Sequence, residues 1–146
     1  MELRVVTANI IEKKGKILLV QEGHKYAYGL WNFPAGKLEE QISLVDNAVK
    51  EAKEESGYNV KVKGVVGIYH HMSKDKNVVV IVFASYMISG ELRKSSDKEI
   101  LQAKWFTYDE IKKMKNTLRG SYILTAIGDY KKKGFLPIST VKSLHV

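Results

Sequence analysis

Short runs of apolar residues, separated by polar segments, recur along the chain and predict several strands. Residues 5–11 and 17–21 are rich in β-branched side chains and are separated by a polar stretch containing Gly15, which predicts a β-hairpin. The continuously apolar run at 78–88 predicts a strand buried on both faces. Further strands are expected at residues 31–33, where Pro34 ends the run, at 60–69 and at 104–107.

Three other segments show the spacing of helices. Residues 43–56 have the helical period, and Gly57 follows where a helix commonly ends. Residues 109–115 and 121–133 are the other two, with Gly134 ending the last. The order of three strands, one helix, three strands and two helices predicts the α/β class, with a mixed β-sheet covered by helices on both sides. Because no repeat or linker interrupts the pattern, residues 1–146 are expected to form a single domain.

The predicted helix at 43–56 carries three carboxylates on one face. At about 100° per residue, Glu51, Glu54 and Glu55 fall within an arc of about 100°. Carboxylates at these spacings repel one another, so the cluster is unfavourable without a cation. The neighbouring arc is apolar and suits packing on a sheet; it consists of Val45, Ala48, Val49 and Ala52.

Basic side chains or a hard divalent metal ion would neutralise this cluster. Ligands that are all oxygen suit Mg²⁺ or Mn²⁺, whereas three glutamates on a helix are also common on a solvated surface. The loop formed by Pro34, Ala35 and Gly36 favours the metal, because Gly36 permits a close backbone approach that a side chain would block. Such a loop can place a carbonyl oxygen beside the helix.

Residues 36–58 resemble the Nudix box, a pattern of the form G-x5-E-x7-R-E-U-x-E-E-x-G-U in which U is a bulky aliphatic residue. Gly36 opens the pattern, and Gly57 falls at the matching distance from it, as do Glu51, Glu54 and Glu55. The resemblance implies the α/β/α sandwich of the Nudix fold. It also implies hydrolysis, by water attack at phosphorus, of a phosphoanhydride bond in a nucleoside di- or triphosphate or another substrate linked to a nucleoside diphosphate.

The resemblance further implies roles for individual residues. The metal ion, Mg²⁺ or alternatively Mn²⁺, would be bound by Glu51, Glu54 and Glu55 with the main-chain carbonyl of Ala35. Such a cation screens phosphate oxygens and lowers the pKa of bound water. Catalysis is assigned to Glu51, Glu54 and Glu99, with either Glu51 or the downstream Glu99 as general base; Glu99 also fits an exposed loop residue.

Two positions depart from the box. Ile42 stands where its first glutamate is expected, and Lys50 replaces the arginine. Lysine keeps the charge but loses the planar fork, so we expect a looser orientation of Glu51. Glu39 or Glu40 could compensate for the carboxylate missing at position 42. A nucleotide-binding sensor with impaired catalysis is therefore an alternative to an active enzyme.

Short strings around residues 31–39 and 118–137 are similar to a branch of bacterial Nudix phosphatases acting on nucleoside tri- and diphosphates and on thiamine-type pyrophosphates. Arg119, expected to open the last helix, would contact phosphate, although a surface cation is the alternative.

Aromatic residues in or near the predicted loops could stack on a base. Tyr28 and Phe33 are taken as substrate-binding residues, with packing in the core or at its rim as the alternative. His70 and His71 would point to opposite faces of an extended strand, so they are not expected to form a joint metal site.

The chain has a formal net charge of +8, most of which lies after residue 110, where eight basic residues accompany one acid, Asp129. This allows RNA 5′-end pyrophosphohydrolysis as an alternative, although no aromatic residues interrupt the lysines at 131–133 to form a stacking platform. A solvated helix face explains the same charge.

The absence of cysteine excludes disulfides and thiolate metal sites. No secretory signal or membrane-spanning run is readable, so we expect a cytoplasmic protein without a membrane partner, either monomer or homodimer.

Overall fold

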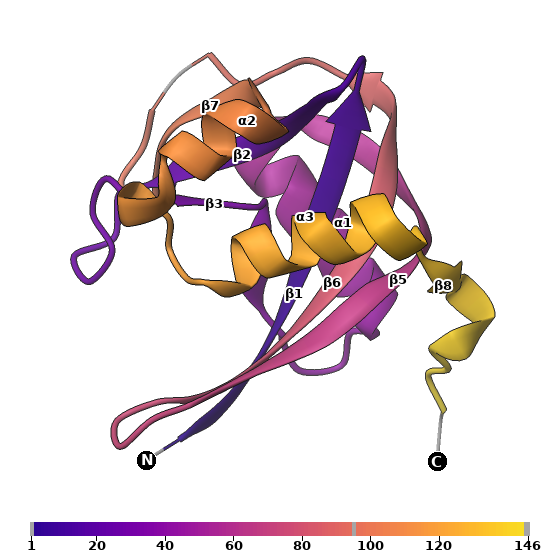
Figure 1. Cartoon of the computed structure of the whole chain (residues 1–146). Helices are drawn as coiled ribbons and strands as arrows, with labels where there is room; N and C mark the ends of the chain where they lie inside the picture. Colours follow the sequence, from indigo (N-terminus) through magenta and orange to yellow (C-terminus); the bar gives the residue numbers. More distant parts are fainter. Residues whose placement is uncertain (1, 95, 145–146) are drawn as a thin grey trace.

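The computed structural model describes residues 2–94 and 96–144 and begins with a β-hairpin (Figure 1). Strands β1 (Leu3–Lys13) and β2 (Lys16–Glu22) are antiparallel, and the two turn residues, Lys14 and Gly15, have positive φ angles of 51° and 77°. Positive φ at both positions is typical of a tight hairpin turn. The predicted hairpin is confirmed, but β1 and β2 pair only next to this turn and then diverge to different neighbours.

Strand β1 lies at the centre of the sheet. It runs parallel to β6, from Leu3 beside Asn77 to Ile11 beside Ser85, whereas the other strand pairs are antiparallel in the part of the chain that the structure describes. The main path is β3-β2-β1-β6-β5-β8, with β4 added to β1 and β7 added to β2. The remaining strands are β3 (Trp31–Asn32), β4 (Ala35–Lys37), β5 (Tyr58–Met72), β6 (Asn77–Gly90), β7 (Ile100–Thr107) and β8 (Leu136–Pro137).

Helices cover both faces of the sheet, which confirms the predicted α/β/α sandwich (Figure 1). The alternation of β6 shows why: Ile81 and Phe83 pack with Ala48 of α1, whereas Val80 and Val82 pack with the buried face of α3. Residues 80–85 are therefore buried on both faces, as the apolar run predicts, while Ile88 near the strand end is exposed. The helices are α1 (Leu44–Ser56), α2 (Tyr108–Lys113) and α3 (Tyr122–Lys133). None of the helices within 2–94 and 96–144 has the length and apolarity needed to cross a membrane.

Helix α1 begins and ends as its sequence predicts. The Ser43 hydroxyl accepts a hydrogen bond from the backbone N–H of Asp46 at 3.0 Å, which satisfies one of the free donors of the first turn. Gly57 ends the helix with φ 91°, a conformation that favours glycine. These caps fix where the acidic face of α1 lies along the chain.

Two short strands, β4 and β8, are not among the predicted elements. Neither has the β-branched pattern of a strand: β4 forms because it pairs with β1, and β8 because it pairs with β5. Strands β5, β6 and β7 extend beyond the predicted bounds, and α2 stops at Lys113, followed by a 3₁₀ turn at Lys115–Thr117.

Two buried asparagines join β4 to helix α1. The Asn9 amide donates to the carbonyls of Pro34 at 3.1 Å and Ala48 at 2.9 Å, and its oxygen accepts from the Ser85 hydroxyl at 2.9 Å. Asn47, on α1, donates to the Thr7 hydroxyl at 2.8 Å and accepts from the Glu39 N–H at 3.2 Å. These contacts hold the strand and the helix in one fixed arrangement.

Asn9→Ala is expected to lower the free energy of unfolding by about 2–4 kcal/mol, because it leaves buried acceptors without donors. Denaturant unfolding followed by circular dichroism measures this. The matched control is Asn59→Ala, which removes a solvent-accessible hydrogen bond of 2.8 Å to Ser89 and should cost less than about 1 kcal/mol. Equal losses in the two variants would contradict the structural role given to Asn9.

Candidate active site

The contact between β4 and α1 brings two of the predicted carboxylates together. The Ala35 N–H donates to Glu55 Oε1 at 2.9 Å. A Cβ added to Gly36 would lie 2.2 Å from Glu51 Cδ, so the Glu51 carboxylate rests directly on the backbone of this glycine. The close approach predicted at Gly36 is therefore real, and the atom that makes it is a side-chain carboxylate.

The Ala35 carbonyl lies on the same edge of β4 as the N–H that binds Glu55. Pro34 accepts from Asn9 N–H at 3.0 Å, and Thr7 pairs with Gly36, so β4 uses the positions on either side of Ala35 to bond β1. In an antiparallel ladder the N–H and C=O of one residue point to the same side. The Ala35 carbonyl thus faces away from β1.

Burial and like charge disfavour ionisation of both carboxyls. Burial raises the pKa of Glu51 from its usual 4.5 to about 7, with the charge of Glu54 as the next cause and Lys50 opposing both. Burial also raises the pKa of Glu55 well above its usual value, against the lowering effect of the Ala35 N–H. These groups would gain from a nearby cation.

The third predicted carboxylate, Glu54, points elsewhere. Its Oε1 lies 3.0 Å from the Lys50 amine, which also contacts Glu39, and all three side chains are substantially exposed. Lys50 therefore pairs with Glu39 and Glu54. The position of Glu51 depends on its packing against Gly36.

One acidic residue at the site was missed by the sequence analysis. Glu22 ends β2, and its charge acts on Glu55. Its Oε2 is buried without a hydrogen-bond partner among the described residues, although Arg119 Nε lies 2.9 Å away as an ion pair. Burial raises the pKa of Glu22, with Arg119 as the largest opposing influence. A polar residue after an apolar strand gives no signal of whether its side chain turns inward.

Arg119 lies beside this acidic group, just before α3. Its backbone N–H donates to the Trp31 carbonyl at 2.8 Å, and its side chain meets Glu22 across β3. The prediction that Arg119 opens the last helix is wrong, because α3 begins at Tyr122 and Arg119 lies in the connection before it.

The remaining predicted residues are placed differently from one another. Glu99 is exposed in the loop before β7, and its charge acts on Glu51 and Glu55. Tyr28 is 68% exposed in the loop after β2, where a ligand can reach it. Phe33 is fully buried in the core, where its ring packs against Tyr122, so its predicted contact with a base is wrong: no surface of the ring is open.

The two histidines also have separate partners. His70 Nε2 lies 2.6 Å from Asn77 Oδ1, whereas the His71 ring meets Tyr122 edge-on at 5.9 Å. They do not face a common point, in agreement with the prediction from the strand period.

The residues at the site fit a hard divalent cation. Within residues 2–94 and 96–144, no three His, Cys, Asp or Glu side chains already form a cluster that could hold a metal ion. The donor chemistry is nevertheless suitable, because two carboxyls with raised pKa lie against the Ala35–Gly36 backbone. Rotation of Glu54 away from Lys50 would add a third carboxylate.

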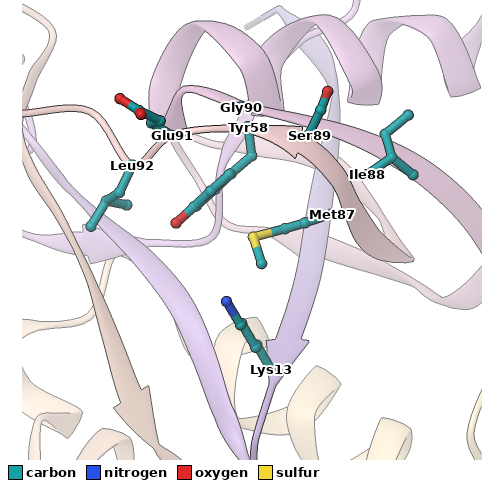
Figure 2. A pocket seen from close by; sticks show the side chains of 8 residues that line it. All are labelled: Lys13, Tyr58, Met87, Ile88, Ser89, Gly90, Glu91 and Leu92. Atoms are coloured by element: carbon teal, nitrogen blue, oxygen red, sulfur yellow. The ribbon is translucent and has the colours of Figure 1, made fainter.

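A surface hollow of about 450 Å³ lies where β5 begins and β6 ends. Figure 2 shows Lys13 pointing into it toward Met87, beside the ring of Tyr58. None of the predicted site residues lines this hollow.

Comparison with known proteins identifies a family. The model of the NUDIX domain matches residues 1–125. An ADP-ribose pyrophosphatase of Methanocaldococcus jannaschii is 33% identical over 112 residues, covering 75% of this chain and 65% of the relative. Phosphatase NudJ of Shigella boydii is 28% identical over 142 residues, covering 94% of this chain and 89% of the relative.

A solved structure agrees along nearly the whole chain. A NUDIX hydrolase from Nitrosomonas europaea superposes with a TM-score of 0.90 at 27% identity and covers 98% of both chains. The chain spans between 31% and 65% of the length of the first four curated relatives that it matches.

The raised pKa of Glu51 predicts a pH-dependent stability. Because the folded-state pKa of about 7 exceeds 4.5, the unfolded chain releases this proton first, and the free energy of unfolding should fall between about pH 4.5 and 7. The shift corresponds to about 3 kcal/mol at most, and solvent screening of the half-exposed group reduces this to about 1–2 kcal/mol. In EDTA at pH 8, Glu51→Gln should be more stable than the unsubstituted protein by that amount, and at pH 4.5 nearly equal.

Denaturant unfolding at a series of pH values measures this difference. Asp75→Asn, at the exposed tip of the β5–β6 hairpin, is the control and should follow the unsubstituted profile. If Glu51→Gln gave no gain at pH 8, the Glu51 carboxylate would not be held in the unfavourable environment described.

Proposed function

The chain belongs to the Nudix family, and on that premise we propose that it hydrolyses a phosphoanhydride bond by directing water to phosphorus. The proposal rests on one observation above all: the Glu51 and Glu55 carboxylates meet the backbone of β4 at Ala35 and Gly36. Phosphoryl transfer needs little covalent chemistry from a protein. It needs charge neutralisation and in-line positioning, which oxygen ligands around a cation can provide.

The proposed cofactor is Mg²⁺, with Mn²⁺ as a substitute. The ion would be held by Glu51, Glu54, Glu55 and the Ala35 carbonyl. Glu51 and Glu55 already lie at β4. When bound, such an ion neutralises phosphate oxygens and lowers the pKa of water. Glu54 would have to exchange its Lys50 contact for the ion, which the exposure of this pair makes easy.

Of the two candidates for general base, we favour Glu51 over Glu99. Glu51 lies against the Gly36 backbone among the proposed metal ligands, where a carboxylate can take a proton from a water molecule that the ion activates. Glu99 is exposed in a loop, where its charge adds to the negative field that attracts a cation.

For the substrate we propose a nucleoside diphosphate linked to a further group, or a nucleoside di- or triphosphate. The relatives named as an ADP-ribose pyrophosphatase and as phosphatase NudJ support this class. Arg119 is the proposed phosphate contact and Tyr28 the proposed aromatic contact, because both side chains are accessible.

A substrate panel tests the proposal. With Mg²⁺ or Mn²⁺ present, the protein should cleave at least one of ADP-ribose, nucleoside di- and triphosphates, dinucleoside polyphosphates and thiamine pyrophosphate. Glu51→Gln and Glu55→Gln should each lower kcat at least about 100-fold, the usual contribution of a general base or an electrostatic group. Separate assays for orthophosphate and pyrophosphate identify the bond that is cut, and Asp75→Asn is the control.

The other outcomes of the panel are informative. Turnover of 5′-triphosphorylated RNA alone, lost on charge reversal of Lys131, Lys132 and Lys133, would replace this substrate class with RNA ends. Nucleotide binding without product, unchanged by Ile42→Glu with Lys50→Arg, would point to a sensor. Undiminished turnover in the two glutamine variants would contradict the proposed site.

Gly36→Ala tests whether the contact between Gly36 and Glu51 contributes to metal binding. The new Cβ would overlap Glu51 Cδ, at 2.2 Å, and would displace that carboxylate, so Mn²⁺ affinity measured by calorimetry should fall about tenfold or more. Gly128→Ala is the matched control, because a Cβ there meets only Tyr108 Oη at 3.9 Å. Equal affinities in the two alanine variants would show that the Gly36 contact has no part in binding.

A further inference from the structure

Arg119 is held by only part of its guanidinium. Nε lies 2.9 Å from Glu22 Oε2, and this is its only side-chain ion pair or hydrogen bond with the described residues. Its two terminal nitrogens therefore have no such partner there, and the side chain is 30% exposed while that of Glu22 is 14% exposed. One edge of the guanidinium is thus anchored inward, and the other is available to a ligand.

A chain of buried polar groups fixes the anchor itself. The Tyr122 hydroxyl donates to Asn32 Oδ1, and both side chains are buried. The Asn32 side chain also lowers the pKa of Glu22, against the raising effect of burial, and so favours the ionised form that pairs with Arg119. Tyr122, Asn32, Glu22 and Arg119 thus form a group of neighbouring polar side chains.

The backbone adds a second restraint on Arg119. Its N–H donates to the Trp31 carbonyl at 2.8 Å, and Leu118 forms a bridge with Trp31. Since β3 pairs with β2 through Asn32 beside Val20 and Trp31 beside Gln21, both attachments of Arg119 lie on these two paired strands. Arg119 is linked to the candidate site through Glu22, whose charge acts on Glu55.

We propose that Glu22 is a positioning residue: it holds Arg119 by Nε, so that the two terminal nitrogens face a phosphate group of the substrate. This inference deepens the proposed function and rests on it. The planar guanidinium can bind two phosphate oxygens at once while it stays anchored. Lysine lacks this planar fork, so an ammonium group held by the Glu22 carboxylate could not present two parallel N–H donors to a phosphate group.

The experiment measures binding of inorganic pyrophosphate to the Mn²⁺-loaded protein by calorimetry. Glu22→Gln should weaken binding about tenfold, and Arg119→Lys as much as Arg119→Ala, because a charge-assisted contact is worth about 1.5–3 kcal/mol. In the Arg119→Ala background, Glu22→Gln should have no further effect, since Glu22 acts through Arg119. Steady-state assays should show a raised KM with kcat within about twofold.

Controls keep a folding defect apart from a binding defect. Arg119→Ala leaves the buried Glu22 charge without its partner and is expected to be destabilised. The double variant Glu22→Gln with Arg119→Ala removes that charge, so its pyrophosphate affinity can still be measured on a folded protein. Lys132→Gln, exposed in the last turn of α3, should bind pyrophosphate normally. Circular dichroism and unfolding confirm the folded fraction of each variant.

Three results would overturn the inference, and the first two are a pyrophosphate affinity of Arg119→Lys equal to that of the unsubstituted protein and an equal loss from Glu22→Gln with and without Arg119. A purely structural ion pair would change stability and leave pyrophosphate affinity intact, which also overturns it. The proposed function fails separately, when no substrate of the panel is cleaved although pyrophosphate binding retains its dependence on Glu22 and Arg119.

Discussion

The docking of helix α1 on strand β4 is the constraint on which the site depends. Asn9 and Asn47 satisfy backbone and hydroxyl groups that would otherwise be buried without partners, and they do so on both sides of the contact. Because α1 is docked on β4, the Ala35 N–H reaches Glu55 and the Glu51 carboxylate lies on Gly36. The acidic groups themselves oppose the arrangement, because burial and mutual repulsion raise their pKa values. The hydrogen bonds of Asn9 and Asn47, together with the core on both faces of the sheet, therefore hold the Glu51 and Glu55 carboxylates close to each other despite their repulsion.

This division between a stabilising frame and an unfavourable site is common where proteins bind cations. The carboxylates gain from a divalent ion that neutralises them, whereas the exposed contacts of Lys50 with Glu39 and Glu54 add little stability and are easily exchanged. Arg119 shows a third situation, in which a partly buried cation is held by one edge. Acidic and basic groups of the site thus differ in how firmly the fold holds them. Glu51 and Glu55, which contact β4, and Arg119, which pairs with Glu22, are held more firmly than Lys50 and Glu54.

The sequence predicts the elements with strong periodicity and misses contacts formed between distant segments. The hairpin turn, the caps of α1 and the two-sided burial of β6 follow from local patterns, and the face shared by Glu51 and Glu55 follows from the helical period. Strand β4 has no strand pattern because its partner β1 defines it. Glu22 and Asn32 look like ordinary polar residues at strand ends until the sheet places them beside Arg119 and Tyr122. Phe33 was misassigned because an aromatic residue next to a loop is equally suited to the core.

The parallel pairing of β1 with β6 has a consequence for how the protein folds. The first strand of the chain lies beside a strand that follows it by about half the sequence, from Leu3 with Asn77 to Ile11 with Ser85. Closing so long a loop costs entropy before the contacts offset it, so such topologies fold slowly. The β1–β2 hairpin and α1 can form early from local signals, but Ser85 reaches the Asn9 oxygen only when β6 arrives. We therefore expect the Ser85–Asn9 contact to form late in folding, because a newly made chain can complete it only after β6 has been synthesised.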